Sequence, residues 1–273
     1  MTPIAPNVLV RNHVHVKGTG PDVLLYAHGF GCNQTMWDAV TPEFATTHKQ
    51  VLFDYVGSGQ SDISAFDATR YSSLDGYAQD VLDVCDALGL NEGITFIGHS
   101  VSSSIGILAS IRRPKLFKQL VLLGPNPCFV NHAPDYVGGF ERKDLQELLE
   151  LMDKNYIGWA QYLAPVVAGP DGGVTVSGKL SESFCSTDPV VARTFAQATF
   201  FADNREDLPF VTRPCLILQH RQDSLAPLAV GNYLNQHLHG STLQILEAAG
   251  HCAHMSHPKL VVKAIRDFVE RPD

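Results

Sequence analysis

Short apolar runs alternate with stretches of helical spacing along much of the chain. Six runs have the length and composition of buried strands, at residues 23–26, 51–55, 94–97, 120–123, 215–218 and 243–246. The clearest helical stripe consists of Leu74, Tyr77, Ala78, Val81, Leu82, Cys85 and Leu88, and Gly89 is placed to end that helix. This alternation predicts a doubly wound, mostly parallel sheet. Residues 8–16 alternate between apolar and polar positions, which predicts antiparallel edge strands.

The alternation stops after Leu123 and does not resume until Cys215. Between them, apolar residues recur at helical spacing at Leu145, Leu148, Leu149 and Met152, at Trp159, Tyr162 and Leu163, and at Val191, Phe195 and Ala198. A Gly-Pro-Asp-Gly-Gly sequence at 169–173 interrupts this pattern, as expected for two helical hairpins joined by a loop. We therefore expect an α/β core at 1–124 and 203–273, and a helical lid at 125–202.

Composition limits the classes of partner. The 273 residues are 45% hydrophobic and 18% charged, enough for one large α/β domain with a full core. The net charge of -8 opposes nucleic-acid binding, which relies on Lys and Arg. No apolar run approaches the roughly 18 residues of a membrane span. The six cysteines are scattered without a C-x-x-C pair, and no N-terminal segment has the pattern of a signal peptide, so we expect reduced thiols in a cytoplasmic protein.

A candidate nucleophile lies in the sequence Gly98-His99-Ser100-Val101-Ser102, which follows one predicted strand and begins a helical stretch. This context is typical of the nucleophile elbow of the α/β-hydrolase fold, a sharp turn that needs small residues two before and two after the serine. Gly98 meets that need, and Ser102 replaces the more common glycine. The alternative is an ordinary serine in a tight turn.

A serine hydroxyl needs a general base, and the base needs an acid that fixes its tautomer. In this fold the acid follows a late strand and the histidine follows the last one. Asp223 and His251 occupy those positions. The other usual position for the acid, after the run that ends at Leu123, holds Gly-Pro-Asn-Pro and offers no carboxylate. We therefore predict a triad of Ser100, His251 and Asp223.

Three histidines, His251, His254 and His257, stand three apart and suggest a metal site as an alternative. Pro258 makes the required geometry unfavourable, and catalytic zinc needs a third suitably placed protein ligand. We expect no metal and no cofactor. His254 is expected to support the loop by hydrogen bonding.

The tetrahedral intermediate of acyl transfer needs two backbone donors for its oxyanion. One is normally the N–H after the nucleophile, here Val101, and the other comes from the loop after an earlier strand. His28-Gly29-Phe30-Gly31 is that loop, which makes the Phe30 N–H the second predicted donor. Phe30 is also expected to form a wall of the pocket.

Motifs along the whole chain resemble the RsbQ-like α/β hydrolases, which include a bacterial stress regulator and the plant strigolactone and karrikin receptors. The residues that carry the resemblance are His28-Gly-Phe-Gly, Leu52-Phe-Asp-Tyr-Val-Gly-Ser-Gly, Leu74-Asp-Gly-Tyr-Ala-Gln-Asp-Val, Gly98-His-Ser-Val-Ser, Ile105-Gly-Ile-Leu-Ala-Ser-Ile-Arg-Arg-Pro, Gly138-Gly-Phe and Asn155-Tyr-Ile-Gly-Trp. Phe184-Cys-Ser-Thr-Asp-Pro and Gly250-His-Cys-Ala-His-Met-Ser-His-Pro are similar to the bacterial regulator, whereas His28 and Ser102 are similar to the plant receptors. The sequence therefore combines features of both branches.

The resemblance implies that the triad hydrolyses a small apolar ester or a butenolide-like lactone, and that the lid reports the bound ligand to a signalling protein partner. It also implies a ligand cavity lined by lid residues Phe129, Phe140, Trp159, Leu163 and Phe200, although packing within the lid would require the same apolar residues. An aromatic lid over Ser100 favours an apolar ligand.

Three functions compete at this stage. Ester turnover is the first, and a receptor with slow or incidental hydrolysis is the second. Haloperoxidase or hydroxynitrile lyase chemistry is the third, because fold does not fix function. Ser100 in the nucleophile position excludes the hydrolases that use an aspartate nucleophile.

Overall fold

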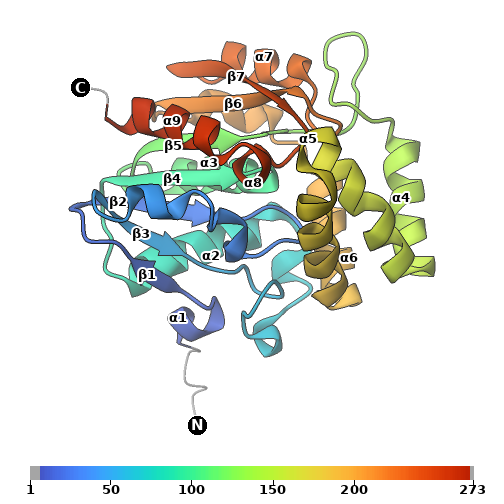
Figure 1. Ribbon diagram of the computed structural model, residues 1–273, viewed down its shortest axis with the longest axis horizontal. Helices are drawn as coiled ribbons and strands as arrows, with labels where there is room; N and C mark the ends of the chain where they lie inside the picture. The colour runs from blue at the N-terminus through green and yellow to red at the C-terminus, as the bar shows by residue number, and fades with distance from the viewer. Residues whose placement is uncertain (1–6, 271–273) are drawn as a thin grey trace.

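A seven-stranded sheet forms the centre of the computed structural model, which describes residues 7–270 (Figure 1). Its order is β1-β3-β2-β4-β5-β6-β7. The strands are β1 His15–Lys17, β2 Asp22–Ala27, β3 His48–Leu52, β4 Ile94–His99, β5 Phe117–Leu123, β6 Cys215–Gln222 and β7 Ser241–Ala249. All neighbours pair in parallel except β1 and β3, so the predicted doubly wound, mostly parallel sheet is confirmed.

Two sequence predictions at the sheet edge need correction. The second predicted strand, 51–55, is β3 at 48–52, because the chain leaves the sheet after Leu52 and the Asp54 N–H bonds instead to the Asn12 carbonyl at 2.8 Å. Residues 8–16 do not form a pair of edge strands. Val8–Arg11 is the helix α1, begun by the Asn7 side chain, and only β1 pairs antiparallel with β3.

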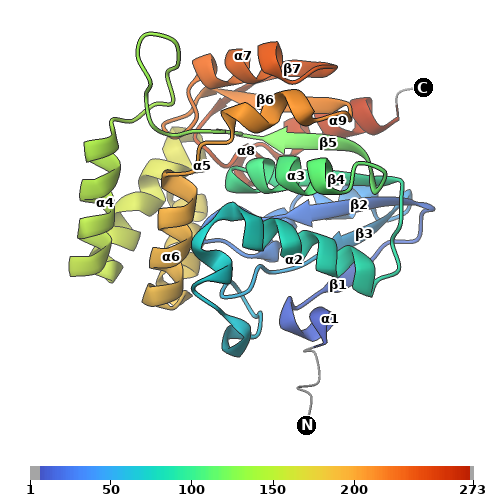
Figure 2. The same cartoon turned by 180° about the vertical axis from the view of Figure 1, so that it is seen from behind.

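Helices cover both faces of the sheet. The α9 helix lies in front of the sheet in Figure 1, whereas α2 and α3 lie in front in Figure 2, the view from behind. The helices of the core are α2 Leu74–Ala87, α3 Val101–Arg112, α7 Leu228–His237, α8 Ala253–Ser256 and α9 Pro258–Val269. The 3-10 helices are η1 Gln34–Trp37, η2 Thr41–Phe44, η3 Ile63–Ala65, η4 Arg70–Ser72 and η5 Arg205–Phe210. Gly89 has φ +66° just after α2, as expected for the glycine that ends this helix.

Three helices between β5 and β6 stack together at one end of the sheet (Figures 1 and 2). They are α4 Arg142–Lys154, α5 Tyr156–Ser186 and α6 Pro189–Phe200, which we call the helical insertion. The predicted interruption at 169–173 is present as a break in α5, where Gly169 and Gly173 have φ +65° and +52°. Tyr162, expected on the apolar stripe, is instead 60% exposed.

The ends of the chain limit two sequence predictions. Residues 1–6 and 271–273, which the sequence assigns to the core, lie outside the described residues. The expected absence of a signal peptide concerns the first of these residues and stays a prediction. Within 7–270, no helix is long and apolar enough to cross a membrane. All six cysteines lie in the described part of the chain and are free thiols.

Candidate active site

Ser100 occupies the turn between β4 and α3 with φ +56° and ψ -122°. Positive φ is strained for a residue with a side chain, and this turn holds the serine hydroxyl above the end of the sheet. The Ser100 N–H donates to the Leu123 carbonyl of the neighbouring strand at 2.8 Å. A Cβ at Gly98 would lie 2.7 Å from the Ser102 carbonyl oxygen, which explains why the turn needs glycine there.

Ser100, His251 and Asp223 form one chain of hydrogen bonds. The His251 Nε2 atom lies 2.8 Å from Ser100 Oγ, and His251 Nδ1 lies 2.8 Å from Asp223 Oδ2. All three side chains are buried, and they come from three separate loops at the carboxyl ends of β4, β6 and β7. The predicted residues are therefore brought together, in the order that a serine nucleophile and its base require.

The α5 break helps to position His251. The His251 N–H donates to the Val167 carbonyl at 2.9 Å, so the helical insertion holds the histidine loop directly. A Cβ at Gly169 would lie 2.4 Å from Gly250 Cα, and a Cβ at Gly250 would lie 2.1 Å from the Ala168 carbonyl oxygen. Glycine on both sides allows this close backbone approach.

Asp223 is surrounded by donors. Its Oδ1 atom accepts from the Leu225 and Ala226 N–H groups at 2.9 and 3.1 Å, and its Oδ2 atom faces two histidines. Burial alone would raise its pKa, but His251 and His220 hold the pKa of this carboxyl well below its ordinary value. Asp223 is therefore ionised at neutral pH.

His220 is a site residue that sequence reasoning missed. Its Nδ1 atom lies 3.1 Å from the same Asp223 Oδ2 that faces His251, and the side chain is fully buried. A histidine two positions after the apolar run 215–218 was a signal of this position, but its partner could be identified only once the turn to Asp223 was known. His220 provides a second contact that fixes the carboxylate.

The two predicted oxyanion donors are the backbone N–H groups of Phe30, in the loop after β2, and of Val101, the residue after Ser100. Neither the Phe30 nor the Val101 backbone N–H has a hydrogen-bond partner within residues 7–270. Val101 is the first residue of α3, where an N–H has no partner inside its helix. Both groups thus remain available to a bound oxygen atom.

Ser102, the residue that replaces the usual glycine, connects the Ser100 turn to the loop that carries Phe30. Its hydroxyl donates to the His28 carbonyl at 2.5 Å and accepts from the Tyr55 hydroxyl at 2.9 Å. The Tyr55 N–H donates to His28 Nε2 at 3.2 Å. Burial lowers the pKa of His28, so its ring is neutral and can accept this bond.

We expect Ser102→Ala to lower kcat about tenfold to hundredfold, because it frees the Phe30 loop from the Ser100 turn and a small displacement of an oxyanion donor is costly. Steady-state kinetics on a chromogenic ester measures the change. Ser103→Ala is the control. It also removes a hydroxyl from α3, but the Ser103 hydroxyl bonds only to the Gly98 carbonyl. Equal losses in the two variants would contradict a specific role for Ser102.

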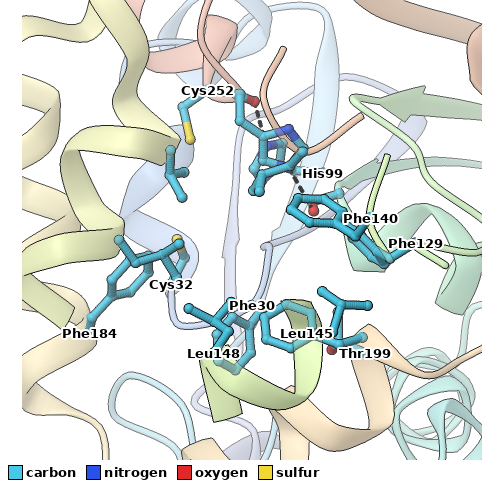
Figure 3. A pocket seen from close by; sticks show the side chains of 16 residues that line it. Phe30, Cys32, His99, Phe129, Phe140, Leu145, Leu148, Phe184, Thr199 and Cys252 are labelled. Atoms are coloured by element: carbon cyan, nitrogen blue, oxygen red, sulfur yellow. Dashed lines mark hydrogen bonds between the residues drawn. The ribbon is translucent and has the colours of Figure 1, made fainter. Parts of the chain in front are cut away.

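An apolar cavity borders Ser100. Figure 3 shows the side chains that line it. It is lined by Phe30, Cys32, His99, Ser100, Phe129, Phe140, Leu145, Leu148, Leu163, Val167, Phe184, Thr199, Phe200, Leu225, His251 and Cys252. Burial raises the pKa of Cys32 to about 12 and that of Cys252 well above its ordinary value. Both stay protonated at neutral pH, so neither thiol competes with Ser100 as a nucleophile.

Four of the five predicted lid residues line this cavity: Phe129, Phe140, Leu163 and Phe200. Trp159 is not among the residues that line the cavity. Trp159 stacks on Tyr156 at 5.6 Å and packs behind Phe30 and Phe184, with ring centroids 6.0 and 5.9 Å away. Its large ring fills the space between the helical insertion and the cavity wall, so it supports the wall without forming it.

The ring nitrogens of His251, His254 and His257 do not form a candidate metal site among the described residues. His254 lies against the Trp37 and His99 rings, with centroids 4.7 and 4.4 Å apart, and His257 stands directly before α9. The expected hydrogen bonding by His254 was wrong: neither ring nitrogen has a partner within the described residues. Burial holds the pKa of His254 well below its ordinary value, so the ring is neutral and acts by packing.

Comparison with known proteins agrees with this geometry. A family model described as the α/β hydrolase family matches residues 24–264. This chain belongs to the α/β hydrolase family. It is 37% identical to a strigolactone esterase of Pisum sativum over 92% of this chain and 94% of that one. It is also 37% identical to a karrikin insensitive 2 receptor of Petunia hybrida, over 93% and 94% of the two chains.

A solved hydrolase has nearly the same structure. A hydrolase from Oleispira antarctica is 48% identical, with a TM-score of 0.95, over 97% of each chain. The predicted α/β-hydrolase fold, the RsbQ-like family and the hydrolase class are thereby confirmed.

Proposed function

We propose that this α/β hydrolase is a serine esterase or lactonase that acts on a small apolar ester through an acyl-enzyme. The observation that carries the proposal is the unbroken chain from Asp223 through His251 to Ser100 at one wall of an apolar cavity. Ser100 is the proposed nucleophile, His251 the general base and Asp223 the group that orients it.

The proposed reaction has two steps. In the first, Ser100 Oγ bonds to the carbonyl carbon of the ester while its proton passes to His251 Nε2. The negative oxygen that forms accepts from the Phe30 and Val101 N–H groups, and the alcohol leaves with the proton held by His251. In the second, His251 takes a proton from water as the water oxygen bonds to the acyl carbon. The bond from that carbon to Ser100 Oγ then breaks, the proton passes from His251 to Ser100 Oγ, and the acid leaves. With a lactone, the released alcohol and acid belong to one molecule.

The cavity supports an apolar substrate. Aromatic and aliphatic side chains form most of its wall, and the polar groups gather at Ser100 and His251. A small-molecule site of this kind selects its ligand by apolar surface and positions it with a few polar groups. The naming of one relative as a strigolactone esterase favours a butenolide-like lactone among such substrates.

A panel of p-nitrophenyl esters and synthetic butenolides tests this proposal. We expect turnover of acetate and short apolar acyl esters, with less activity on charged acyl groups, because the cavity offers no cation or anion to pair with them. Absence of turnover on every ester and lactone of the panel, with a folded protein, would contradict the esterase assignment.

Phe200 and Phe201 provide a matched pair for the cavity. Phe200 lines the cavity, whereas Phe201, the residue directly after α6, packs against Arg142 and does not line the cavity. We expect Phe200→Ala to raise KM for a bulky apolar ester by about tenfold, with a smaller change for the acetate ester, because apolar contact area is lost. Phe201→Ala should leave both substrates unchanged, as measured by steady-state kinetics. Equal losses on both substrates in Phe200→Ala would indicate general damage instead.

A ligand receptor with slow hydrolysis is the second candidate function, favoured by the relative named as a karrikin insensitive 2 receptor. In this proposal residues 125–202 act as a lid whose ligand-bound form recruits a signalling protein partner. The His251 N–H bond to Val167 connects the proposed lid to the triad, so a ligand held at Ser100 contacts both.

Hydrogen exchange tests the lid proposal directly. A ligand shifts a lid equilibrium only by its differential affinity for the two states, so a saturating butenolide should change protection within 125–202 while the sheet stays unaffected. Ser100→Ala keeps the ligand intact during the measurement. Unchanged protection throughout the lid at saturation would contradict the receptor function and leave a plain esterase.

A further inference from the structure

A cysteine, a histidine and an aspartate meet where the chain enters and leaves the helical insertion. Cys128 follows β5, and Asp203 follows α6, and the two pair as an antiparallel bridge. The Asn204 N–H also donates to the Pro127 carbonyl at 2.8 Å, so this contact between the two connections is supported by the backbone. His132 lies in the loop between β5 and α4.

The distances among these side chains fit a tetrahedral metal ion. Cys128 Sγ lies 3.6 Å from His132 Nε2, and the same nitrogen lies 3.9 Å from Asp203 Oδ2. A sulfur and a nitrogen bound to one tetrahedral zinc ion, at about 2.3 and 2.0 Å, are about 3.5 Å apart. The Asp203 carboxylate is the third candidate ligand, since the three ligand atoms lie within 4.8 Å of one another.

The surroundings also suit an ion. The Cys128 residue is 2% exposed, whereas the His132 and Asp203 side chains are 42% and 38% exposed, so solvent reaches one side of the cluster and a water molecule can be the fourth ligand. Arg205 donates to both Asp203 oxygens, and this ion pair lowers the pKa of the carboxyl and orients it. Carboxylates that bind metals are commonly held by such an outer partner, although the Arg205 charge also weakens the attraction of a cation.

We propose that Cys128, His132 and Asp203 form a binding site for a zinc-class divalent ion at the base of the helical insertion. The metal–sulfur bond forms with the Cys128 thiolate, and the thiol proton passes to the solvent. The bound ion joins the two connections of the helical insertion next to Phe129, which lines the cavity. This site departs from the sequence expectation of no metal, because Asp203 is distant from Cys128 and His132 in the sequence and the three residues form no metal-binding motif.

A second cluster of suitable groups must be distinguished from this site. His220, Asp223 and His251 also lie within 4.8 Å of one another, but they are buried and already bonded to one another. That cluster contains no sulfur. A readout that reports metal–sulfur bonding therefore separates the two sites.

Titration of the full chain with Co²⁺, followed by the near-ultraviolet absorption of a cobalt–thiolate bond, tests the proposal. We expect saturable absorption that Zn²⁺ removes by competition. Cys128→Ser should abolish it, and His132→Ala should weaken Co²⁺ binding by more than about 100-fold, since loss of an outer partner alone costs 10- to 100-fold. Cys185→Ser, which changes a partly exposed thiol elsewhere, should leave it unchanged.

Thermal unfolding with and without Zn²⁺ guards against misfolded variants. Wild type and Cys185→Ser should gain thermal stability with Zn²⁺, whereas Cys128→Ser and His132→Ala should unfold cooperatively without that gain. No cobalt–thiolate absorption in wild type would overturn the proposal. Absorption that persists undiminished in Cys128→Ser or in His132→Ala would overturn it as well.

Discussion

Ser100→Ala should reduce ester turnover about 10⁶-fold, the loss found when a serine nucleophile is removed from a triad. The change deletes one buried hydroxyl that bonds to His251 Nε2, and it leaves the backbone turn and its Leu123 contact in place. The fold should therefore persist, with cooperative thermal unfolding close to that of wild type. Kinetics on the p-nitrophenyl acetate ester measures the loss.

Ser104→Ala is the matched control. Ser104 is another buried serine, one turn further along α3. Its replacement by alanine also deletes one hydroxyl, but this hydroxyl does not contact His251. Its turnover should stay within a few-fold of wild type. A folded Ser100→Ala variant that keeps most of its activity would remove Ser100 from the nucleophile role.

Asp223→Asn should cost about 10⁴ in kcat, as the equivalent change does in a serine protease. The amide oxygen can still accept from Leu225 and Ala226, which turns the amide N–H₂ toward His251 Nδ1. His251 must then accept at Nδ1 and carry its proton on Nε2. In that tautomer it cannot take the proton of Ser100.

Asp171→Asn is the control for this change. Asp171 accepts from the Ala249 N–H at 2.6 Å, so it is a second carboxylate held against the strand that leads to His251. The loss of the Asp171 charge should change kcat by no more than a few-fold in the same assay. A loss below tenfold in Asp223→Asn, or an equal loss in Asp171→Asn, would show that another group fixes the histidine.

The sequence was most informative where a local pattern has one structural solution. Gly98 and Ser102 around Ser100 predict a tight strand-to-helix turn, because only small residues fit there. The apolar runs predicted the parallel strands, because a strand that is buried on both faces needs a continuous run of apolar residues. The 169–173 break was also predictable, because it contains three glycines, of which Gly169 and Gly173 adopt positive φ.

Long-range contacts account for what the sequence did not reveal. The Asn7 cap and the Asn12 contact with Asp54 decide that residues 8–11 are helical and that β3 ends at Leu52. The position of Trp159 depends on how Phe30 and Phe184 pack beneath it. No pattern along the chain encodes such contacts.

The same limit applied at the site. The Ser102–Tyr55–His28 connection joins residues from different strands and turns, whereas His220 contacts Asp223 only three residues later, across the turn that ends β6. A histidine after an apolar run and a serine in place of glycine were visible in the sequence, but each had many possible partners. Only the folded turn after β6 selects Asp223 for the histidine, and only the arrangement of the sheet selects His28 for the serine.

Intact-protein mass spectrometry of the acyl-enzyme tests the central claim most directly. Wild-type protein quenched in acid during turnover of a slowly released p-nitrophenyl ester should gain the mass of one acyl group, and peptide mapping should place it on Ser100. Ser100→Ala should gain none under the same conditions. An adduct on another residue, such as Cys32 or Cys252 in the cavity wall, or an adduct that persists in Ser100→Ala, would contradict the account.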